Sequence, residues 1–175
     1  MEFATRYTFH NLPSTFVRKS FSIRLKGYKR KMIEKMKSKI QQSIFGGIIG
    51  TAVMTVVMFV APMMGMPKMN PAATLSAMMG LPIVIGWVMH FMIGIVFGLG
   101  YVFVFEKWVR KINNRVLKGA IFGIAVFIFA QVMMAVMGAV MGGMPSPEGN
   151  MLLIMMGSII GHIVYGIVTV QFIKN

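Results

Sequence analysis

Cysteine and acidic residues are what this sequence most lacks. It has no cysteine and only four Asp or Glu among 175 residues. The first absence excludes disulfides, thiolate metal ligands and cysteine nucleophiles. The acidic residues all lie outside the long apolar runs, so a hydrolase site inside a membrane span would have no carboxylate to orient its base. Phosphate-binding loops and dinucleotide motifs are also absent. We expect a protein that is not an enzyme.

Charge is scarce outside two blocks. Only 13% of the residues are charged, against about 25% in soluble proteins, and the mean hydropathy is +0.74. Four apolar runs reach the roughly 20 residues that cross a bilayer, and backbone in hydrocarbon must be helical to satisfy its hydrogen bonds. The sequence therefore predicts an all-α domain over residues 44–175, after a basic segment over 1–43. The expected transmembrane helices are 44–65, 82–105, 117–141 and 150–173.

The formal net charge of +14 follows membrane topology. Lys and Arg concentrate in residues 1–41, in the loop 107–118 and at Lys174, whereas the other two loops hold only Lys68 and Glu148. By the positive-inside rule, both termini and the central loop face the cytoplasm. We expect a multi-pass protein whose main partner is the lipid bilayer, and no binding of nucleic acid.

The basic N-terminal segment contains a helical stripe of apolar residues with Lys and Arg opposite. Gly27 weakens its early half, so we expect the helix mainly from Lys29 onward. This pattern predicts a helix lying on anionic lipid headgroups. Two alternatives stay open: an accessory extension over residues 1–35, with Met32 or Met36 as the working start, and an organelle-targeting presequence.

Small residues and turn signals organise the spans. Gly46 and Gly50 form a small-xxx-small pair that permits close helix approach. Asn70-Pro71 and Gly80 bracket a short helix over 72–79, which we expect at the outer interface or folded back on the bundle. In the second span, glycines and a histidine recur every four residues, and this stripe is predicted to face protein. Its members are Gly86, His90, Gly94 and Gly98.

A seven-residue pattern occurs twice in the sequence. His90 and His162 each begin the pattern His, three apolar residues, Gly, Ile, Val. Aligning Gly46 with Gly119 brings further small residues of the first and third spans into correspondence. These coincidences indicate two parallel helical-hairpin repeats, related by an axis along the membrane normal.

The two histidines are the ionisable groups deep in the spans, where such groups are functional candidates by default. Thr55 and Gln131 lie at similar depths, so each span contributes one polar residue to a common layer. The simplest interpretation is that Thr55, His90, Gln131 and His162 hydrogen-bond to one another and fix helix register, with no cofactor bound.

Three alternatives use the same region. His90 and His162 would ligate haem, with Gly94 and Gly166 making room for the macrocycle. A soft metal such as Cu(I) would use imidazole nitrogen and thioether sulfur. The small-residue stripes would instead line the path of a small transporter or channel subunit, which with four spans would function as a homo-oligomer. The candidate metal ligands are His90, His162, Met54, Met58, Met133 and Met137.

Three runs resemble a family of small, uncharacterised four-helix bacterial membrane proteins. They are GTAVMTVVMFVAPMMGMPKMNPAA (50–73), GWVMHFMIGIVFG (86–98) and GSIIGHIVYGIV (157–168). The resemblance covers about residues 44–172 and implies a location in the bacterial cytoplasmic membrane. It carries no activity, cofactor or catalytic residue, and it favours residues 1–35 as an accessory extension.

Overall fold

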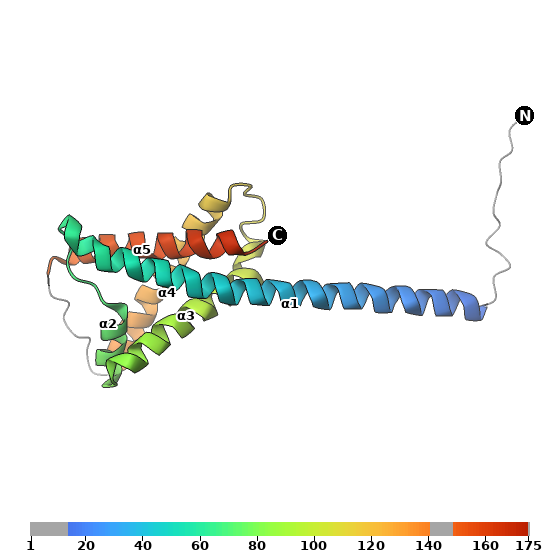
Figure 1. Ribbon diagram of the computed structural model, residues 1–175, viewed down its shortest axis with the longest axis horizontal. Helices are drawn as coiled ribbons and strands as arrows, with labels where there is room; N and C mark the ends of the chain where they lie inside the picture. The colour runs from blue at the N-terminus through green and yellow to red at the C-terminus, as the bar shows by residue number, and fades with distance from the viewer. Residues whose placement is uncertain (1–13, 141–148, 175) are drawn as a thin grey trace, which may run out of the picture. The chain divides into compact units, whose positions relative to one another are not determined.

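The protein is helical throughout the part of the chain that the structure describes. A computed structural model describes residues 14–140 and 149–174, which contain no strand. The long helices follow the apolar runs, as the sequence predicts. The elements are α1 (Ser14–Val60), η2 (Ala61–Met64), α2 (Pro71–Met79), α3 (Ile83–Phe103), η3 (Phe105–Lys107), α4 (Arg115–Val140) and α5 (Met151–Phe172) (Figure 1).

Four of these helices are long and apolar enough to cross a membrane. The candidate spans are Ser22–Met64, Ile83–Phe103, Arg115–Val140 and Met151–Phe172. Three of them agree with the predicted spans to within two residues at either end. A helix that ended inside an apolar run would leave backbone groups unsatisfied in hydrocarbon. The all-α, four-span fold class is confirmed.

The chain divides into two compact units between Ser38 and Lys39. In the first, the described residues are all helical, and the side chains of residues 22–38 are exposed. The helix begins at Ser14, well before the expected Lys29, and Gly27 does not interrupt it. A single glycine costs a helix only about 1 kcal/mol, which the flanking Lys, Arg and Leu residues offset. Arg30 and Glu34 form an i,i+4 ion pair at 3.3 Å.

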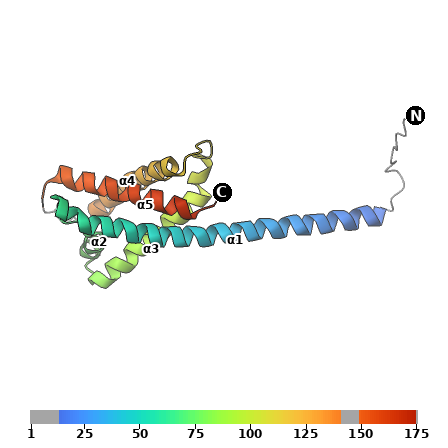
Figure 2. The same ribbon diagram turned by 45° about the horizontal axis from the view of Figure 1, so that its top comes forward.

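The second unit contains the membrane bundle. Residues 39–60 of α1 pack with α3 and α5, and α4 packs along α5. The short helix α2 folds back on α3, as one of the two sequence expectations had it, and its Ala72 is fully buried. Figure 2 shows the bundle turned by 45°, with α4 beside α5 and α2 beside α3.

Asparagine caps begin three helices. The Asn70 side chain accepts a hydrogen bond from the backbone N–H of Ala73 at 3.0 Å, and Asn150 accepts one from Leu152 at 2.9 Å. Asn114 serves α4 in the same way. Gly80 ends α2 with φ +64°, a conformation that favours glycine. The short helix is therefore found one residue longer than predicted, with Asn70 and Gly80 at its ends as expected.

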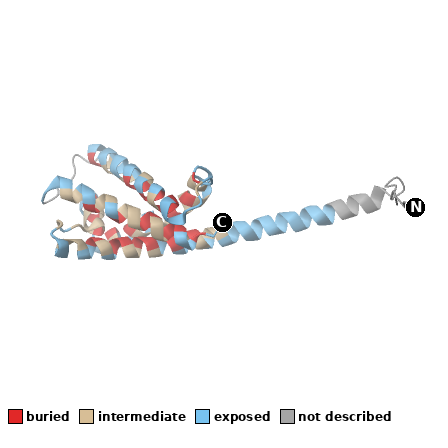
Figure 3. Ribbon diagram, turned by 90° about the horizontal axis from the view of Figure 1, so that it is seen from above, coloured by how far each residue is buried: buried red, intermediate tan, exposed pale blue. Residues whose placement is uncertain are grey.

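The bundle has a narrow interior and an apolar exterior. Buried residues run along the faces where helices meet, and the outward faces are exposed (Figure 3). The exposed faces carry large apolar side chains such as Val84, Val96 and Ile128. Exposed apolar surface over whole helix faces is expected of a protein whose solvent is lipid. Tyr101 is buried in this interior, and its ring centroid lies 5.0 Å from that of Phe122.

Candidate functional site

His90 and Thr55 join α3 to α1 inside the bundle. Both side chains are buried, and His90 Nε2 lies 3.2 Å from Thr55 Oγ1. The Thr55 hydroxyl donates its single proton to the Thr51 carbonyl at 2.8 Å. It can therefore only accept from His90, which assigns the imidazole proton to Nε2. This pair realises half of the predicted polar layer.

His162 is bonded within its own helix. Its Nδ1 lies 2.7 Å from the Ser158 carbonyl oxygen, and that contact requires Nδ1 to carry the proton. The ring meets Phe127 of α4 edge-on, with 5.6 Å between centroids. The hydrogen bonds of the two imidazoles thus assign them opposite tautomers.

Gln131 does not join this layer. Its side chain is exposed on α4, and no hydrogen bond links it to the histidines or Thr55. The inward face of α4 is formed by Gly119, Gly123 and Phe127, and a step of four residues rotates about 40° round a helix. By Gln131 this rotation has carried the side chain out of the interface. Equal depth in the membrane therefore does not place two side chains together unless their helical phases also agree.

The glycine faces are occupied by neighbouring helices. A Cβ at Gly47 would lie 2.6 Å from the Gly94 carbonyl oxygen, and a Cβ at Gly94 would collide with Thr51. On the other side, Gly166 lies directly against the backbone of Gly119 and Gly123. The space that the haem hypothesis assigns to a macrocycle beside Gly94 and Gly166 is therefore filled by helix backbone.

Two hydrogen bonds between helices involve residues that sequence reasoning did not select. Tyr165 Oη donates to the Gly94 carbonyl at 2.6 Å, and Thr169 Oγ1 donates to the Gly46 carbonyl at 3.2 Å. Both donors lie on α5 and are buried. A hydroxyl inside an apolar run was the available signal, since it must find a partner in hydrocarbon.

The methionines of the metal hypothesis are separated. Met54 and Met58 are buried and lie against Gly161 of α5, and the Met69 side chain lies against Gly157. The α4 methionines of the hypothesis instead reach outward, Met133 being exposed and Met137 half-buried. Met54 and Met58 therefore pack inside the bundle, whereas Met133 lies on its surface.

Several charged groups lie together at one end of the bundle, which we call its basic end. Lys39 Nζ lies 2.7 Å from both carboxylate oxygens of Glu106, and this pair is about four-fifths buried. Lys118, in the first turn of α4, is 6% exposed. At the same end, the backbone N–H of Lys174 donates to Gln42 Oε1 at 2.7 Å. The bundled part of α1 and helix α4 thus begin at the end of the bundle where α3 and α5 finish.

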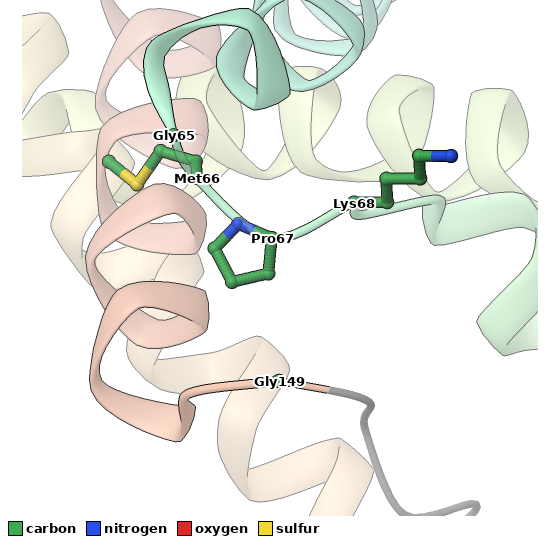
Figure 4. Close-up of a pocket in the computed structure, with 5 residues that line it drawn as sticks. All are labelled: Gly65, Met66, Pro67, Lys68 and Gly149. Carbon is green, nitrogen blue, oxygen red and sulfur yellow. The ribbon is translucent and has the colours of Figure 1, made fainter.

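A shallow hollow of about 400 Å³ lies beside the opposite loops. It is lined by Met66, Pro67 and Lys68 with two glycines, and the Lys68 side chain extends away from Pro67 (Figure 4). Gly149 borders residues 141–148, which the structure does not describe. Among the described residues that line the hollow, Lys68 carries the charged side chain, and the other four have no ionisable group.

A comparison with known protein families gives a match over most of the chain. Residues 37–174 match a family of unknown function, DUF6789. Neither the curated proteins nor the solved structures include a match. The matched region contains the whole membrane bundle, and residues 1–36 lie outside it. Since the match covers well over half of its length, the chain belongs to this family of unknown function.

Proposed function

We propose that the protein is a non-enzymatic integral membrane protein whose inward polar and small residues hold four spans in one packed bundle. The observation that carries this proposal is the occupancy of the glycine faces. Gly47, Gly94 and Gly166 each meet the backbone of a neighbouring helix. Close backbone approach of this kind stabilises helix association in lipid, where no hydrophobic effect acts between helices.

The polar layer fits a structural role. The His90–Thr55 pair and the Tyr165–Gly94 bond connect different helices. Among the described residues, every fully buried side-chain nitrogen or oxygen has a hydrogen-bond partner. The Ser158–His162 contact, at 3.5 Å, has no carboxylate beside it in the described spans. These groups are arranged to satisfy one another, which supports packing over catalysis.

The packing also supports a duplicated hairpin. Gly47 meets Gly94 between α1 and α3, and Gly119 meets Gly166 between α4 and α5. Both residues of the second pair follow those of the first by 72 positions. Thr55–His90 and Phe127–His162 are separated by the same interval. The sequence alignment paired Gly119 with Gly46, and these contacts favour Gly47 as its equivalent.

We propose a bacterial cytoplasmic membrane as the location, with the basic end of the bundle inside. Lys39, Arg115, Lys118 and Lys174 belong to the helix ends that meet on this side. Positive charge of this kind is retained on the cytoplasmic side during insertion.

Soft-metal binding is a second candidate function. His162 Nδ1 is held by the Ser158 carbonyl, an arrangement that orients Nε2 and its lone pair for a metal. Met54, Met58 and Met69 lie against the glycines of the same helix, and thioether with imidazole suits Cu(I). Haem ligation and transport stay predictions of the sequence.

The test is purification of the whole chain in mild detergent, followed by a visible spectrum and elemental analysis. If the polar layer has only a structural role, the purified protein should be colourless and contain no stoichiometric copper or iron. A Soret band, or copper that is lost in His162→Ala and Met58→Ala but retained in Met133→Ala, would overturn it. Met133→Ala is the matched control because this methionine lies on the outward surface of α4.

A further inference from the structure

Gln131 presents an amide on the outer surface of a membrane span. It precedes Val140, the last residue of α4, by nine positions, or about 14 Å. Its side chain is exposed, and no hydrogen bond joins the amide to another residue within 14–140 and 149–174. Fourteen ångströms is too far for a glutamine side chain to reach the interface. An unsatisfied amide in hydrocarbon is costly, so this position calls for a partner.

One side of α4 around Gln131 has the residue pattern of a helix-packing face. Five exposed residues, spaced three or four apart, lie in a stripe along this side of the helix. The stripe carries no charge, and its outer part consists of alanines, which allow close approach of another helix. We define this α4 stripe as Ile124, Ile128, Gln131, Ala135 and Ala139.

We propose that the α4 stripe is the interface of a homodimer, in which α4 packs against α4 of a second copy. Two copies inserted by the same route share one orientation in the membrane. A two-fold axis along the membrane normal therefore brings each residue near the axis opposite itself, at equal depth. The amide of glutamine both donates and accepts, so Gln131 is complementary to the partner's Gln131.

A second copy suits the stripe better than an unrelated protein. A different partner protein would need its own polar group at the depth of Gln131. In a symmetric dimer, the second copy provides that group with its own Gln131. The inward glycines are already occupied within one chain, so the dimer takes a face of α4 that the bundle leaves open. The proposal rests on α4 as a membrane span and is independent of whether His162 binds a metal.

Cysteine cross-linking tests the geometry in native membranes, because the chain has no cysteine of its own. Ala135→Cys, on the stripe, should give disulfide-linked dimers on mild oxidation. Met92→Cys, on the lipid-facing side of α3 with 58% exposure, should not. Two differently tagged copies, expressed together, identify the product as a dimer of this chain. Monomeric Ala135→Cys, or a cross-link to another protein instead, would overturn the proposal.

Energy transfer between labelled copies in liposomes tests the amide. Gln131→Leu should weaken dimerisation about three- to thirtyfold, the range expected for one interhelical polar contact. Gln131→Asn should retain most of the association, and Met133→Leu, at similar depth on another face, should leave it unchanged. Circular dichroism checks that each variant keeps its helices. Dimerisation that is unaffected by Gln131→Leu would contradict amide pairing.

Discussion

At the residue scale, glycine decides how closely the spans approach. Gly98 of α3 faces α1, and a Cβ there would lie 2.5 Å from the Ser43 carbonyl oxygen. Gly100 belongs to the same helix, yet a Cβ at that position would have no neighbour within 4 Å. Two glycines separated by one residue thus have opposite roles. One permits helix contact, and the other only lowers helix propensity.

This contrast gives a prediction about stability. Gly98→Ala should destabilise the bundle by about 1–3 kcal/mol, because its methyl group must displace backbone. Gly100→Ala should be neutral or stabilising by up to about 1 kcal/mol, since alanine restricts the unfolded chain and favours helix. Unfolding of both variants in mixed detergent measures the difference. Equal stability of the two would show that close contact at Gly98 does not hold the bundle together.

Sequence reasoning identified part of the candidate site at this scale. His90 and Thr55 lie on inward stripes, and the structure brings them within 3.2 Å. Gln131 was grouped with them by depth alone, although its position round α4 turns it outward. The Tyr165 hydroxyl in an apolar run indicates that a partner is needed, but the sequence does not identify that partner as the Gly94 carbonyl, 71 residues away.

At the element scale, nearly all helix bounds follow from the sequence. Apolar length sets the spans, and asparagine caps with a terminal glycine set α2. The beginning of α1 is the exception, since the helix begins at Ser14 and the sequence pattern predicts it mainly from Lys29 onward. Contacts between helices were less accessible, because they depend on the helical phase that small residues acquire in three dimensions.

The basic part of α1 carries its own prediction. Leu25, Tyr28, Met32 and Met36 are exposed apolar residues of a helix rich in Lys and Arg. We expect this segment to lie on anionic lipid, to which each cation near the surface contributes about 1 kcal/mol. A polarity-sensitive dye on Met32→Cys should shift to the blue in nanodiscs with anionic lipid.

The control is the same labelled protein in nanodiscs of zwitterionic lipid, where little shift is expected. High salt should reverse the shift, because screening weakens attraction between the helix and the headgroups. A dye response that is equal in both lipids would contradict the anchor and favour an accessory extension with no lipid contact.

At the scale of the whole molecule, the net charge of +14 is concentrated in a few segments of the sequence. Within the bundle, Lys39, Glu106 and Lys118 occupy the end where α3 finishes and α4 starts. At the other end, η2 and α2 carry no charged residue. This asymmetry is the charge pattern that the positive-inside rule associates with an oriented membrane protein.

The asymmetry predicts how the bundle is oriented, and single cysteines test it. Asn113→Cys, in the loop between α3 and α4, should react with a membrane-impermeant maleimide only after the cells are permeabilised. Met63→Cys, in η2 and 86% exposed, should react in intact cells. Asn113 is chosen over Asn114 because the latter caps α4, so its loss would disturb the helix. The reverse labelling pattern would place the basic end outside, and the charges would then have to serve an external partner. Reaction of both positions in intact cells would instead mean two orientations in one membrane, which would bring Gln131 of oppositely inserted copies to different depths and remove the symmetry on which the α4 dimer depends.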